Sequence, residues 1–372
     1  MRPRGPLTQS AGLSVRIDKS YIEDLMYGRR NSLCIGYILR ILSALYGLVV
    51  RLRCTFYAHA FLRQKKLPQR VISVGNITLG GTGKTPTVMQ IAGVLCRNRK
   101  HPVVISRGYG RSDESALVVV SDGKQVLVDA KTGGDEPVLI GSKLVDVPVV
   151  ADSNRFRAAL FALQKFGNDT VILDDGFQHL QVQRDLDIVL LDAVDPFGSG
   201  KLFPAGILRE PLSALQRAHA VLITGTERVE DLGPLKSVIR QNTQARIFTS
   251  CQVPSDLVDV MTGETKPLSA LRGTAVLAFS GIARPASFVS LLQSLGAEVK
   301  VKFAYPDHYD YKSSDLTAIV QRAADERISM IVTTEKDAVR LRNLTPGGIV
   351  ALRIELKVVE NEEWEAVLLN KI

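Results

Sequence analysis

The sequence is poor in cysteine and tryptophan, with four Cys and one Trp among 372 residues. Cys34, Cys54, Cys96 and Cys251 lie far apart, and no two of them form a C-x-x-C pair. This spacing predicts neither a disulfide framework nor a zinc site, and it fits a reducing cytoplasm. A single Trp gives little support to a nucleic-acid-binding surface, which stacks bases on aromatic side chains.

Positive charge is in excess and is unevenly distributed. The formal net charge of +9 would attract nucleic acid, an anionic membrane surface or phosphorylated substrates, and the total alone does not choose among them. The basic residues flank an apolar segment, which favours a membrane whose cytoplasmic leaflet is negative. Much of the excess precedes residue 71, in Arg29, Arg30, Arg40, Arg51, Arg53, Arg63, Lys65, Lys66 and Arg70.

The apolar segment runs from Leu33 to Val50. As a helix it would be about 27 Å long, slightly less than the roughly 30 Å hydrocarbon core of a bilayer. Arg40 lies inside it, where a charge is costly unless its side chain reaches the interface. A helix in the membrane plane and a short tilted span are both open, and a buried core helix is the alternative. We expect residues 1–66 to form an N-terminal extension with a membrane-associated helix.

From residue 71 onward, short β-branched runs alternate with longer amphipathic stretches. Such alternation predicts βαβ units, and therefore an α/β fold with a parallel sheet flanked by helices. Ligands bind beyond the carboxyl ends of the strands in an open α/β sheet, and nearly every predicted strand is followed by a polar residue or glycine. The first set of strands is Val71–Val74, Pro102–Ser106, Val147–Ala151, Thr170–Leu173, Asp187–Leu191 and Ala220–Ile223.

A second α/β set follows the first. At 372 residues and 45% hydrophobic content, the chain exceeds what one core usually supports, so we expect two lobes. The predicted division is a main α/β core in residues 67–227, a linker region in residues 228–271 and a smaller C-terminal α/β lobe in residues 272–372. The strands of the second set are Ala275–Phe279, Glu298–Phe303, Ser329–Thr333 and Ile349–Ile354.

The sharpest motif is VISVGNITLGGTGKTP, residues 71–86, in which a hydrophobic strand runs directly into a glycine-rich loop. Backbone N–H groups of such a loop wrap a polyphosphate, its lysine reaches the β and γ phosphates, and its threonine hydroxyl ligates Mg²⁺. The G-x-x-x-x-G-K-[ST] pattern requires glycine at the position where this chain has Thr78. The flanking strand and helix still favour a P-loop NTPase-like core that binds ATP and Mg²⁺. The predicted nucleotide-binding residues are Thr78, Leu79, Gly80, Gly81, Thr82, Gly83, Lys84 and Thr85.

A second motif, TVILDDGFQH, is an apolar strand that ends in Asp174 and Asp175. P-loop enzymes place an acid here to hold the Mg²⁺ coordination sphere opposite the loop threonine. Two adjacent buried acids are unfavourable without a cation, so the pair predicts a metal site shared with Thr85. Which acid approaches Mg²⁺ more closely stays open. His179, in the same motif, is open between a catalytic, a supporting and a structural role.

Four further polar motifs fall where a kinase would need them. S-R-G-Y-G-R offers Arg107 and Arg111 to phosphates, and T-G-G-D-E-P places Asp135 in a glycine turn before a short helix. L-R-E-P supplies Arg209, and Y-P-D-H-Y supplies His308 from the second lobe. Each motif alone is more typical of a capped turn or a solvated charge. Together they predict a cleft between the lobes.

Taken in order, these motifs closely resemble the tetraacyldisaccharide 4′-kinase family, the lipid A 4′-kinases. The resemblance implies transfer of the γ-phosphate of ATP to the 4′-hydroxyl of tetraacyldisaccharide 1-phosphate at the cytoplasmic face of the inner membrane. The departure at Thr78 is itself usual in that family. The matching segments, from residue 71 to about residue 341, are V-G-N-I-T-L-G-G-T-G-K-T-P, S-R-G-Y-G-R, G-D-E-P, D-D-G-F-Q-H, G-x-L-R-E-P, P-D-H-Y and T-E-K-D-A-V.

The same resemblance implies roles for individual residues. Asp135 activates the sugar hydroxyl, with His308 as its partner from the other lobe. Lys84 acts on the phosphates, and Arg209 acts on the transferring phosphoryl group or on the phosphate of the substrate. These roles suit phosphoryl transfer, which depends mainly on positioning and charge neutralisation. The implied partners are the lipid substrate and the inner-membrane surface, reached through the N-terminal helix, and no nucleic acid is expected.

Two other classes of protein rank below a kinase. A membrane-associated P-loop ATPase or GTPase that assembles or targets proteins would share the glycine loop and the acidic strand end. A guanine-specific protein would require N-K-x-D, whereas Lys336 and Asp337 are adjacent in T-T-E-K-D-A-V. A nucleic-acid-binding protein would agree with the net charge, but the basic residues cluster around an apolar helix instead.

Overall fold

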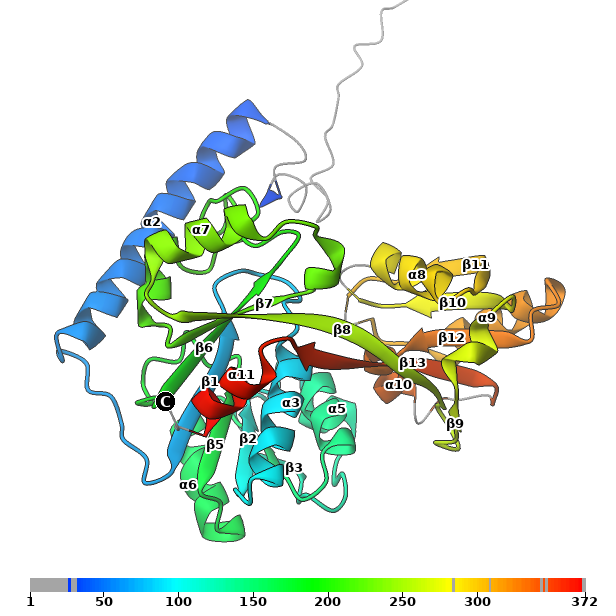
Figure 1. Ribbon diagram of the computed structural model, residues 1–372, viewed down its shortest axis with the longest axis horizontal. Helices are drawn as coiled ribbons and strands as arrows, with labels where there is room; N and C mark the ends of the chain where they lie inside the picture. The colour runs from blue at the N-terminus through cyan, green and yellow to red at the C-terminus, as the bar shows by residue number, and fades with distance from the viewer. Residues whose placement is uncertain are drawn as a thin grey trace, which may run out of the picture.

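One continuous β-sheet organises the molecule (Figure 1). The computed structural model describes residues 26–27, 32–282, 285–307, 309–341, 344 and 347–369. The strands of these residues form a single 13-stranded sheet, most of whose neighbouring strands run parallel, with helices on its faces. The predicted α/β class with a P-loop core is therefore confirmed.

The first half of the sheet carries the glycine-rich loop at its centre. Its strands are β1 (Arg70–Asn76), β2 (Pro102–Ser106), β3 (Val118–Ser121), β4 (Val149–Ala151), β5 (Thr170–Asp174), β6 (Leu186–Asp192) and β7 (Ala220–Thr224). They lie in the order β7-β6-β1-β5-β2-β4-β3, all parallel except that β3 runs antiparallel to β4. The accompanying helices are α3 (Lys84–Arg97), α4 (Ala130–Gly133), α5 (Asp135–Lys143) and α6 (Arg155–Phe166).

The second half repeats this α/β arrangement on a smaller scale. Its strands are β10 (Ala275–Ser280), β11 (Glu298–Ala304), β12 (Met330–Thr334) and β13 (Ile349–Val358), in the parallel order β11-β10-β12-β13. The helices of this half are α8 (Pro285–Ser294), α9 (Ser313–Asp325) and α10 (Glu335–Leu341). Helix α10 follows β12 directly, so its N-terminus lies at the carboxyl edge of the sheet.

A long strand, β8 (Arg246–Asp259), joins the two halves. It pairs in parallel with β7 up to Ser250 and antiparallel with β13 from Ser250 onward, and the short strand β9 (Thr265–Lys266) adds to its far end. The range 228–271, interpreted from the sequence as a linker, thus contains helix α7 (Gly233–Asn242) and a 14-residue strand of the sheet. Both halves therefore share one hydrogen-bonded frame.

The ten strands predicted from the sequence are all present, with ends within about four residues of those expected. Strands β3, β8 and β9 have no predicted counterpart. In β8, Pro254 and several half-exposed polar residues interrupt the apolar alternation that would identify a strand. Its pairing with two distant strands fixes its conformation instead.

The last helix, α11 (Asn361–Leu368), returns to the first half and packs on the P-loop helix α3. Trp364 is fully buried, and its ring meets Phe248 edge-on with 5.1 Å between the ring centroids. Its Nε1–H donates to Oε1 of Gln90 on α3 at 2.9 Å. The end of the chain thus supports the helix that follows the glycine-rich loop.

The N-terminal helix, α2 (Leu33–Ala58), continues past the apolar segment that predicted it. Only 11% of its apolar window is buried, so it is not a core helix. By length and composition alone, it is the one helix among the described residues that would be able to cross a membrane. It lies along the first half of the molecule (Figure 1), where Ser43 Oγ donates to the Leu202 carbonyl and the Tyr46 hydroxyl donates to the Arg209 carbonyl, both at 2.9 Å. One side of α2 is docked, and the other is exposed.

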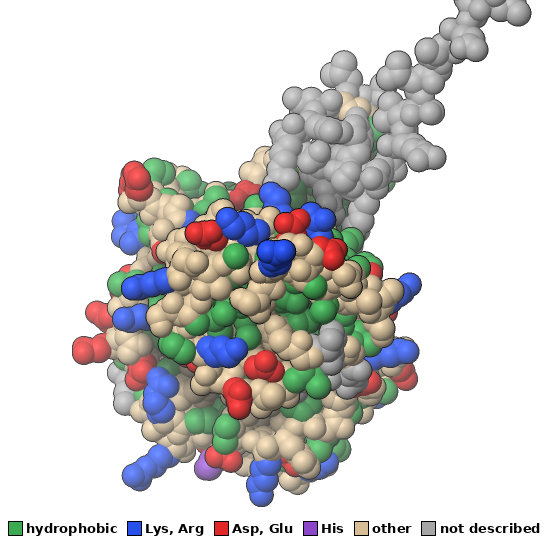
Figure 2. Space-filling view, turned by 90° about the vertical axis from the view of Figure 1, so that its right-hand side faces the viewer, with side chains coloured by type: hydrophobic (Ala, Val, Ile, Leu, Met, Phe, Trp, Pro, Cys, Tyr) green, Lys and Arg blue, Asp and Glu red, His purple; other side chains and the backbone are tan. Residues whose placement is uncertain are grey.

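The face formed by the second half carries charges of both signs (Figure 2). Lys and Arg are interspersed there with Asp and Glu, and small apolar patches lie between them. Such mixed charge favours solubility over attraction of one class of ligand. Charged groups converge instead beyond the ends of β1 and β5 and between α5 and α10.

Candidate active site

The glycine-rich loop is held in shape by its own hydrogen bonds. Gly80 and Gly83 have φ of 108° and 81°, in the left-handed region that favours glycine, and Gly83 immediately precedes α3. Asn76 Nδ2 donates to Thr82 Oγ1, and Thr224 Oγ1 donates to the Thr82 carbonyl, both at 3.0 Å. The positive end of the α3 dipole faces this loop, which makes the loop a ready site for phosphate.

Thr78 and Leu79 anchor the start of the loop to a segment far along the chain. The Leu79 N–H donates to the Ile207 carbonyl at 2.7 Å, and Thr78 forms an isolated β-bridge with Leu208. Thr78 is also buried. The backbone itself therefore holds the segment that carries Arg209 beside the glycine-rich loop.

Asp174, at the end of β5, is buried and incompletely hydrogen-bonded. Ser106 Oγ, at the end of β2, donates to its Oδ2 at 2.9 Å, whereas its Oδ1 has no hydrogen-bond partner among the described residues. Burial, followed by the nearby carboxylates of Glu136 and Asp175, raises the pKa of Asp174 to about 7. Burial therefore outweighs the charge of Lys84 and the Ser106 hydrogen bond, which both act to lower this pKa.

Asp175, the next residue, lies between two cations. Lys84 Nζ is 3.7 Å from its Oδ1, and Arg209 Nη1 is 2.9 Å from its Oδ2. Burial acts to raise the pKa of Asp175, but the charges of Lys84 and Arg209 outweigh burial and hold that pKa below its usual range. The backbone of Asp175 has a φ of 51°, uncommon for a residue other than glycine. Two adjacent acids thus have opposite electrostatic environments.

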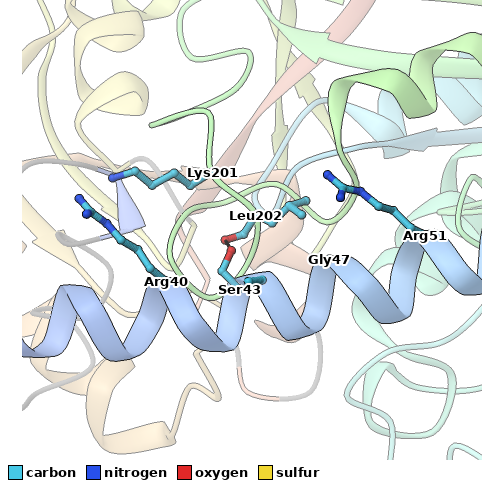
Figure 3. Close-up of a pocket in the computed structure, with 7 residues that line it drawn as sticks. Arg40, Ser43, Gly47, Arg51, Lys201 and Leu202 are labelled. Carbon is cyan, nitrogen blue, oxygen red and sulfur yellow. Dashed lines mark hydrogen bonds between the residues drawn. The ribbon is translucent and has the colours of Figure 1, made fainter.

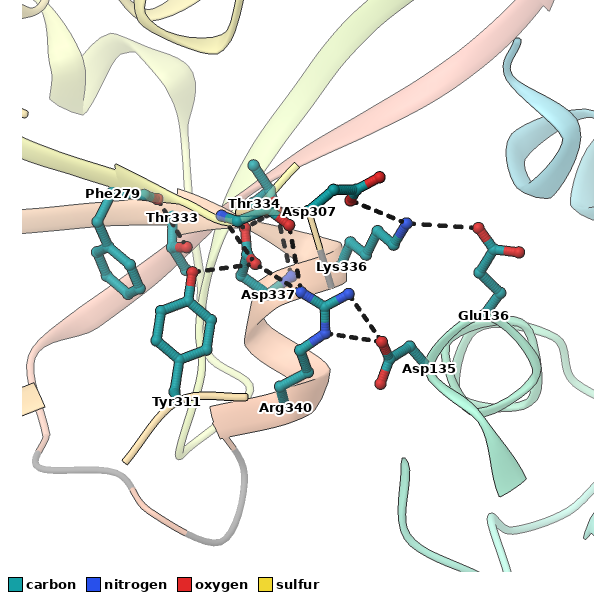
Figure 4. Close-up of polar contacts among 11 residues, drawn as sticks. Asp135, Glu136, Phe279, Asp307, Tyr311, Thr333, Thr334, Lys336, Asp337 and Arg340 are labelled. Atoms are coloured by element: carbon teal, nitrogen blue, oxygen red, sulfur yellow. Dashed lines mark hydrogen bonds and ion pairs between the residues drawn. The ribbon is translucent and has the colours of Figure 1, made fainter. Parts of the chain in front are cut away.

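Asp135 begins α5, and its carboxylate faces the second half of the molecule (Figure 4). Arg340 of α10 donates from Nε to its Oδ2 at 2.8 Å and brings Nη2 within 2.7 Å of the same oxygen. Arg340 also donates from Nη1 to Asp337 at 3.2 Å. Asp337 is fully buried and accepts from the Gly281 N–H and the Tyr311 hydroxyl at 3.1 Å. A fixed acid thus holds the arginine, and the arginine orients Asp135.

Further ion pairs join α5 to α10. Lys336 Nζ lies 3.5 Å from Glu136 Oε1 and 3.7 Å from Asp307 Oδ1 (Figure 4). At the other end of α5, Lys143 pairs with Glu335. Two motifs some 200 residues apart in the sequence, G-D-E-P and T-E-K-D-A-V, are therefore joined by polar contacts.

The remaining predicted residues, His308, Arg111 and Arg107, make no described contact with the acids after β5. His308, predicted as a catalytic partner, lies outside the described residues. Arg111, which the sequence offered to phosphates, is buried instead, and its guanidinium donates to the carbonyls of Ala151 at 3.2 Å and Glu114 at 2.8 Å. It therefore supports the loop that carries Arg107. Arg107 is exposed, with Nε 3.6 Å from a Glu114 carboxylate oxygen.

Two arginines of the site were not predicted from the sequence. Arg155, at the start of α6, is buried and interacts electrostatically with Asp174 and Asp175, and its Nε has no partner in the described part of the chain. Arg155 could have been found from the sequence, because S-N-R follows soon after the end of β4, as the polar residues of the other motifs follow their strands. Arg340 lies one helical turn after Lys336 in T-E-K-D-A-V-R, and only the contact between the halves reveals its role.

His179 carries no charge at physiological pH. Burial, followed by the positive charges of four arginines, lowers its pKa to about 4. Within the described residues, its Nε2 has no hydrogen-bond partner. The four arginines are Arg155, Arg184, Arg53 and Arg107.

Known proteins are similar to this chain in sequence and in fold. Residues 35–372 match the family model described as Tetraacyldisaccharide-1-P 4'-kinase. A curated tetraacyldisaccharide 4'-kinase of Syntrophus aciditrophicus (strain SB) is 40% identical over 346 residues, which cover 90% of this chain and 92% of that protein. One of Halothermothrix orenii is 39% identical, with coverage of 87% and 88%. A crystal structure of LpxK from Aquifex aeolicus in complex with ATP matches with a TM-score of 0.76 at 35% identity, and covers 91% of this chain and 99% of that one.

Replacing His179 by Gln should reduce the dependence of stability on pH. The folded-state pKa is about 4 and the unfolded one about 6.5, so the unfolded chain binds more protons in this window. Wild-type stability is therefore lost as the pH falls from 6.5 toward 4, and His179→Gln avoids this loss. We expect the melting temperature of the variant to fall less between pH 7 and pH 5. The control is His101→Gln, at an exposed histidine; curves for His179→Gln parallel to wild type would contradict the prediction.

Proposed function

This chain belongs to the tetraacyldisaccharide-1-P 4'-kinase family, and we propose that its glycine-rich loop, the acids after β5 and Asp135 perform the reaction. The enzyme transfers the γ-phosphate of ATP to the 4′-hydroxyl of tetraacyldisaccharide 1-phosphate in lipid A biosynthesis. The observation that carries the site assignment is the convergence of Lys84 and Arg209 on Asp175 beside the loop, at 3.7 and 2.9 Å. A P-loop ATPase that assembles proteins is not favoured, because the family match spans residues 35–372.

Thr85 and Asp174 are the proposed ligands of Mg²⁺. The buried Oδ1 of Asp174, without a hydrogen-bond partner among the described residues, supports this role, and oxygen ligands suit Mg²⁺. The raised pKa of Asp174 is that expected of a carboxylate whose ionised form needs a cation. Asp175 is less suited, because Lys84 and Arg209 already neutralise it. When bound, Mg²⁺ neutralises charge on the β- and γ-phosphate oxygens.

Lys84 and Arg209 are proposed to hold the transferring phosphoryl group. Asp175 keeps both cations in place before ATP arrives, so little side-chain freedom is lost when the phosphates bind. Donors fixed in this way stabilise the charge that develops on the phosphoryl oxygens without reorganising during the reaction. Gly80–Thr85 wrap the phosphates, while Thr78 and Leu79 tie the loop to the segment before Arg209.

Asp135 is the proposed general base. It accepts the proton of the 4′-hydroxyl as that oxygen bonds to the γ-phosphorus, while the bond from the γ-phosphorus to the bridging oxygen breaks and ADP leaves. The two contacts from Arg340 to Oδ2 support this role, because they fix the position of that oxygen at the start of α5. By the family resemblance, His308 is the proposed partner of Asp135.

The division into lobes is also a proposal: an N-terminal extension (1–66), a P-loop kinase core (67–227), a linker region (228–271) and a C-terminal lobe (272–372). The ion pairs from Asp135 to Arg340 and from Glu136 to Lys336 support a site to which both lobes contribute. Contact between α5 and α10 would then be required for transfer.

Helix α2 is proposed to hold the enzyme on the cytoplasmic face of the inner membrane. Its polar contacts with the first half of the molecule run from Ser43, which faces Leu202 (Figure 3), to Cys54, so the helix lies along the protein surface. These contacts support an orientation in the plane of the membrane. An exposed apolar row follows helical spacing, as expected for a face buried among lipids. Its members are Ile38, Ile41, Leu45, Leu48 and Leu52, each 46–57% exposed.

Lys84→Ala should slow phosphoryl transfer by about 100-fold or more, because a fixed cation is lost from the developing charge. The measurement is transfer of radiolabelled γ-phosphate from ATP to tetraacyldisaccharide 1-phosphate in detergent micelles. Lys124→Ala, which removes an exposed lysine, is the control and should keep the wild-type rate. ATP hydrolysis by the wild type without labelled lipid would instead support the ATPase alternative.

Asp135→Asn should lower kcat by about 100-fold, the typical loss of a general base. Arg340→Met should lower kcat by about 10-fold with the KM for ATP unchanged, and Arg340→Lys should recover part of this loss. If Arg340 acts through Asp135, the double variant Asp135→Asn/Arg340→Met will be no slower than Asp135→Asn alone. Additive losses in the double variant would show that Arg340 acts independently.

Leu45→Glu with Leu52→Glu should weaken binding to vesicles that contain phosphatidylglycerol by at least about 10-fold, because two apolar contacts with lipid are replaced by charges. Co-sedimentation measures the bound fraction, and the melting temperature confirms the fold. The matched control is Val145→Glu with Val359→Glu, at exposed apolar positions away from α2. Equal loss in both pairs would contradict a specific role for α2.

A further inference from the structure

The last helix, α11, contacts the elements that frame the glycine-rich loop. Strand β1 leads into the loop and helix α3 leaves it. Strand β7, the parallel neighbour of β8, ends at Thr224, whose hydroxyl donates to the Thr82 carbonyl at 3.0 Å. Helix α11 packs on α3 (Figure 1), and hydrogen bonds join α11 and its N-cap residue to β1, α3 and β8. Since α11 contributes no residue to the loop, its effect on a nucleotide would pass through these elements.

The first contact joins the start of α11 to β8. The carboxylate of Glu360, the N-cap residue, accepts hydrogen bonds from the N–H and the hydroxyl of Thr249, both at 2.8 Å. The Val359 N–H donates to the Thr249 carbonyl at 2.9 Å. Thr249 lies opposite Ile223 of β7, the residue before Thr224. The start of α11 is therefore fixed close to the strand whose end holds the loop.

The second contact joins the middle of α11 to α3. Trp364 is fully buried, with its ring edge-on to Phe248 of β8, and its Nε1–H donates to Oε1 of Gln90 at 2.9 Å. Arg97, two helical turns after Gln90 on α3, lies 3.3 Å from the Glu365 carboxylate. Because Arg97 is exposed, this ion pair contributes little to the free energy of unfolding. The buried bond from Trp364 is therefore the contact that directs α3.

The third contact joins the end of α11 to the start of β1. Arg70, the first residue of β1, donates from its guanidinium to the carbonyls of Val367 and Leu368. These carbonyls lie in the last turn of α11, where a helix leaves its carbonyls without internal partners and where its dipole favours a cation. Strand β1 ends at Asn76, whose side chain donates to Thr82 Oγ1 at 3.0 Å. A strand that α11 fixes at its start thus holds the loop at its end.

The position of α3 bears on ATP because this helix begins at Lys84, beside the proposed phosphate site. Gln90 lies six residues further along α3, which is about 9 Å from Lys84 along the helix axis. Apolar packing of α3 on the sheet has no direction, whereas a hydrogen bond requires a particular angle and so restrains rotation of the helix. The bond from Trp364 therefore restrains α3 close to its phosphate-binding end.

We propose that α11 positions the helix after the glycine-rich loop, with Trp364 and Gln90 as a positioning pair that sets the affinity for ATP. The inference rests on the proposed function, in which this loop binds the phosphates of ATP. Without the bond between the two side chains, α3 occupies its binding-competent position for a smaller fraction of the time. The apparent dissociation constant for ATP then rises by the inverse of that fraction. Once ATP is bound, the transfer itself proceeds as before.

The test removes each partner of this bond in turn, in Gln90→Met and in Trp364→Phe. Each variant should raise the dissociation constant for ATP about fivefold, the effect of one ordinary hydrogen bond. The double variant should bind ATP no more weakly than either single variant, because all three lack the same bond. Gln90→Glu keeps an oxygen acceptor and should recover most of the affinity. Equilibrium dialysis with radiolabelled ATP and Mg²⁺, without acceptor, measures the constant.

Two further measurements separate positioning from stability. The kcat at saturating ATP should equal that of the wild type in every variant, since the groups that perform the transfer are unchanged. The matched control is Ile319→Val, at a fully buried residue of the second half that lies away from α11. It lowers the melting temperature by removing a buried methyl group, and it should leave the affinity for ATP unchanged.

Lower melting temperatures of the α11 variants with wild-type affinity for ATP would overturn the proposal, because α11 would then contribute to stability alone. A lower kcat with an unchanged dissociation constant would overturn it as well. If the wild type bound ATP without phosphorylating the lipid acceptor, the proposed kinase function would fail, and the dialysis would still decide the role of α11. Failure of the wild type to bind ATP would reject both.

Discussion

Two adjacent carboxylates at the end of a buried strand need positive charge, and the arrangement of the site follows from that need. Asp175 is neutralised within the protein by Lys84 of the glycine-rich loop and by Arg209 from a distant segment. Asp174 is fully buried and accepts a hydrogen bond from Ser106, and its burial, followed by the charges of Glu136 and Asp175, raises its pKa to about 7. The protein thus satisfies one acid itself and leaves the other suited to an external cation.

The segment that supplies Arg209 connects this charge balance to α2, the helix proposed to hold the enzyme on the membrane. Its backbone pairs with the start of the glycine-rich loop through Leu208 and Thr78, and the Arg209 carbonyl accepts a hydrogen bond from Tyr46 of α2. Because hydrogen bonds fix both sides of this segment, it holds α2 and the glycine-rich loop at a set separation. An acceptor that stays in the bilayer would then meet the γ-phosphate at a fixed depth.

The sequence predicted those parts of the molecule whose residues are neighbours in the chain. The P-loop and the Asp174–Asp175 pair follow directly from strands with continuous apolar patterns, and ten strands were recognised in the same way. Strand β8 was interpreted as a linker because its polar composition conceals a conformation imposed by β7 and β13. The contact between Arg340 and Asp135 was not predicted, because it joins residues 205 positions apart and no local sequence pattern encodes such a pairing.

The register between α5 and α10 is set by charges at the helix ends. Asp135 and Glu136 begin α5 and Lys143 ends it, while Glu335 begins α10 and Arg340 lies in its last turn, so each charge is favourable to its own helix dipole. Because Asp135 pairs with Arg340 and Lys143 pairs with Glu335, each end of α5 meets the opposite end of α10. A shift by one helical turn would separate these pairs and bring like charges together. The charges that stabilise each helix therefore also fix where the carboxylate of Asp135 lies.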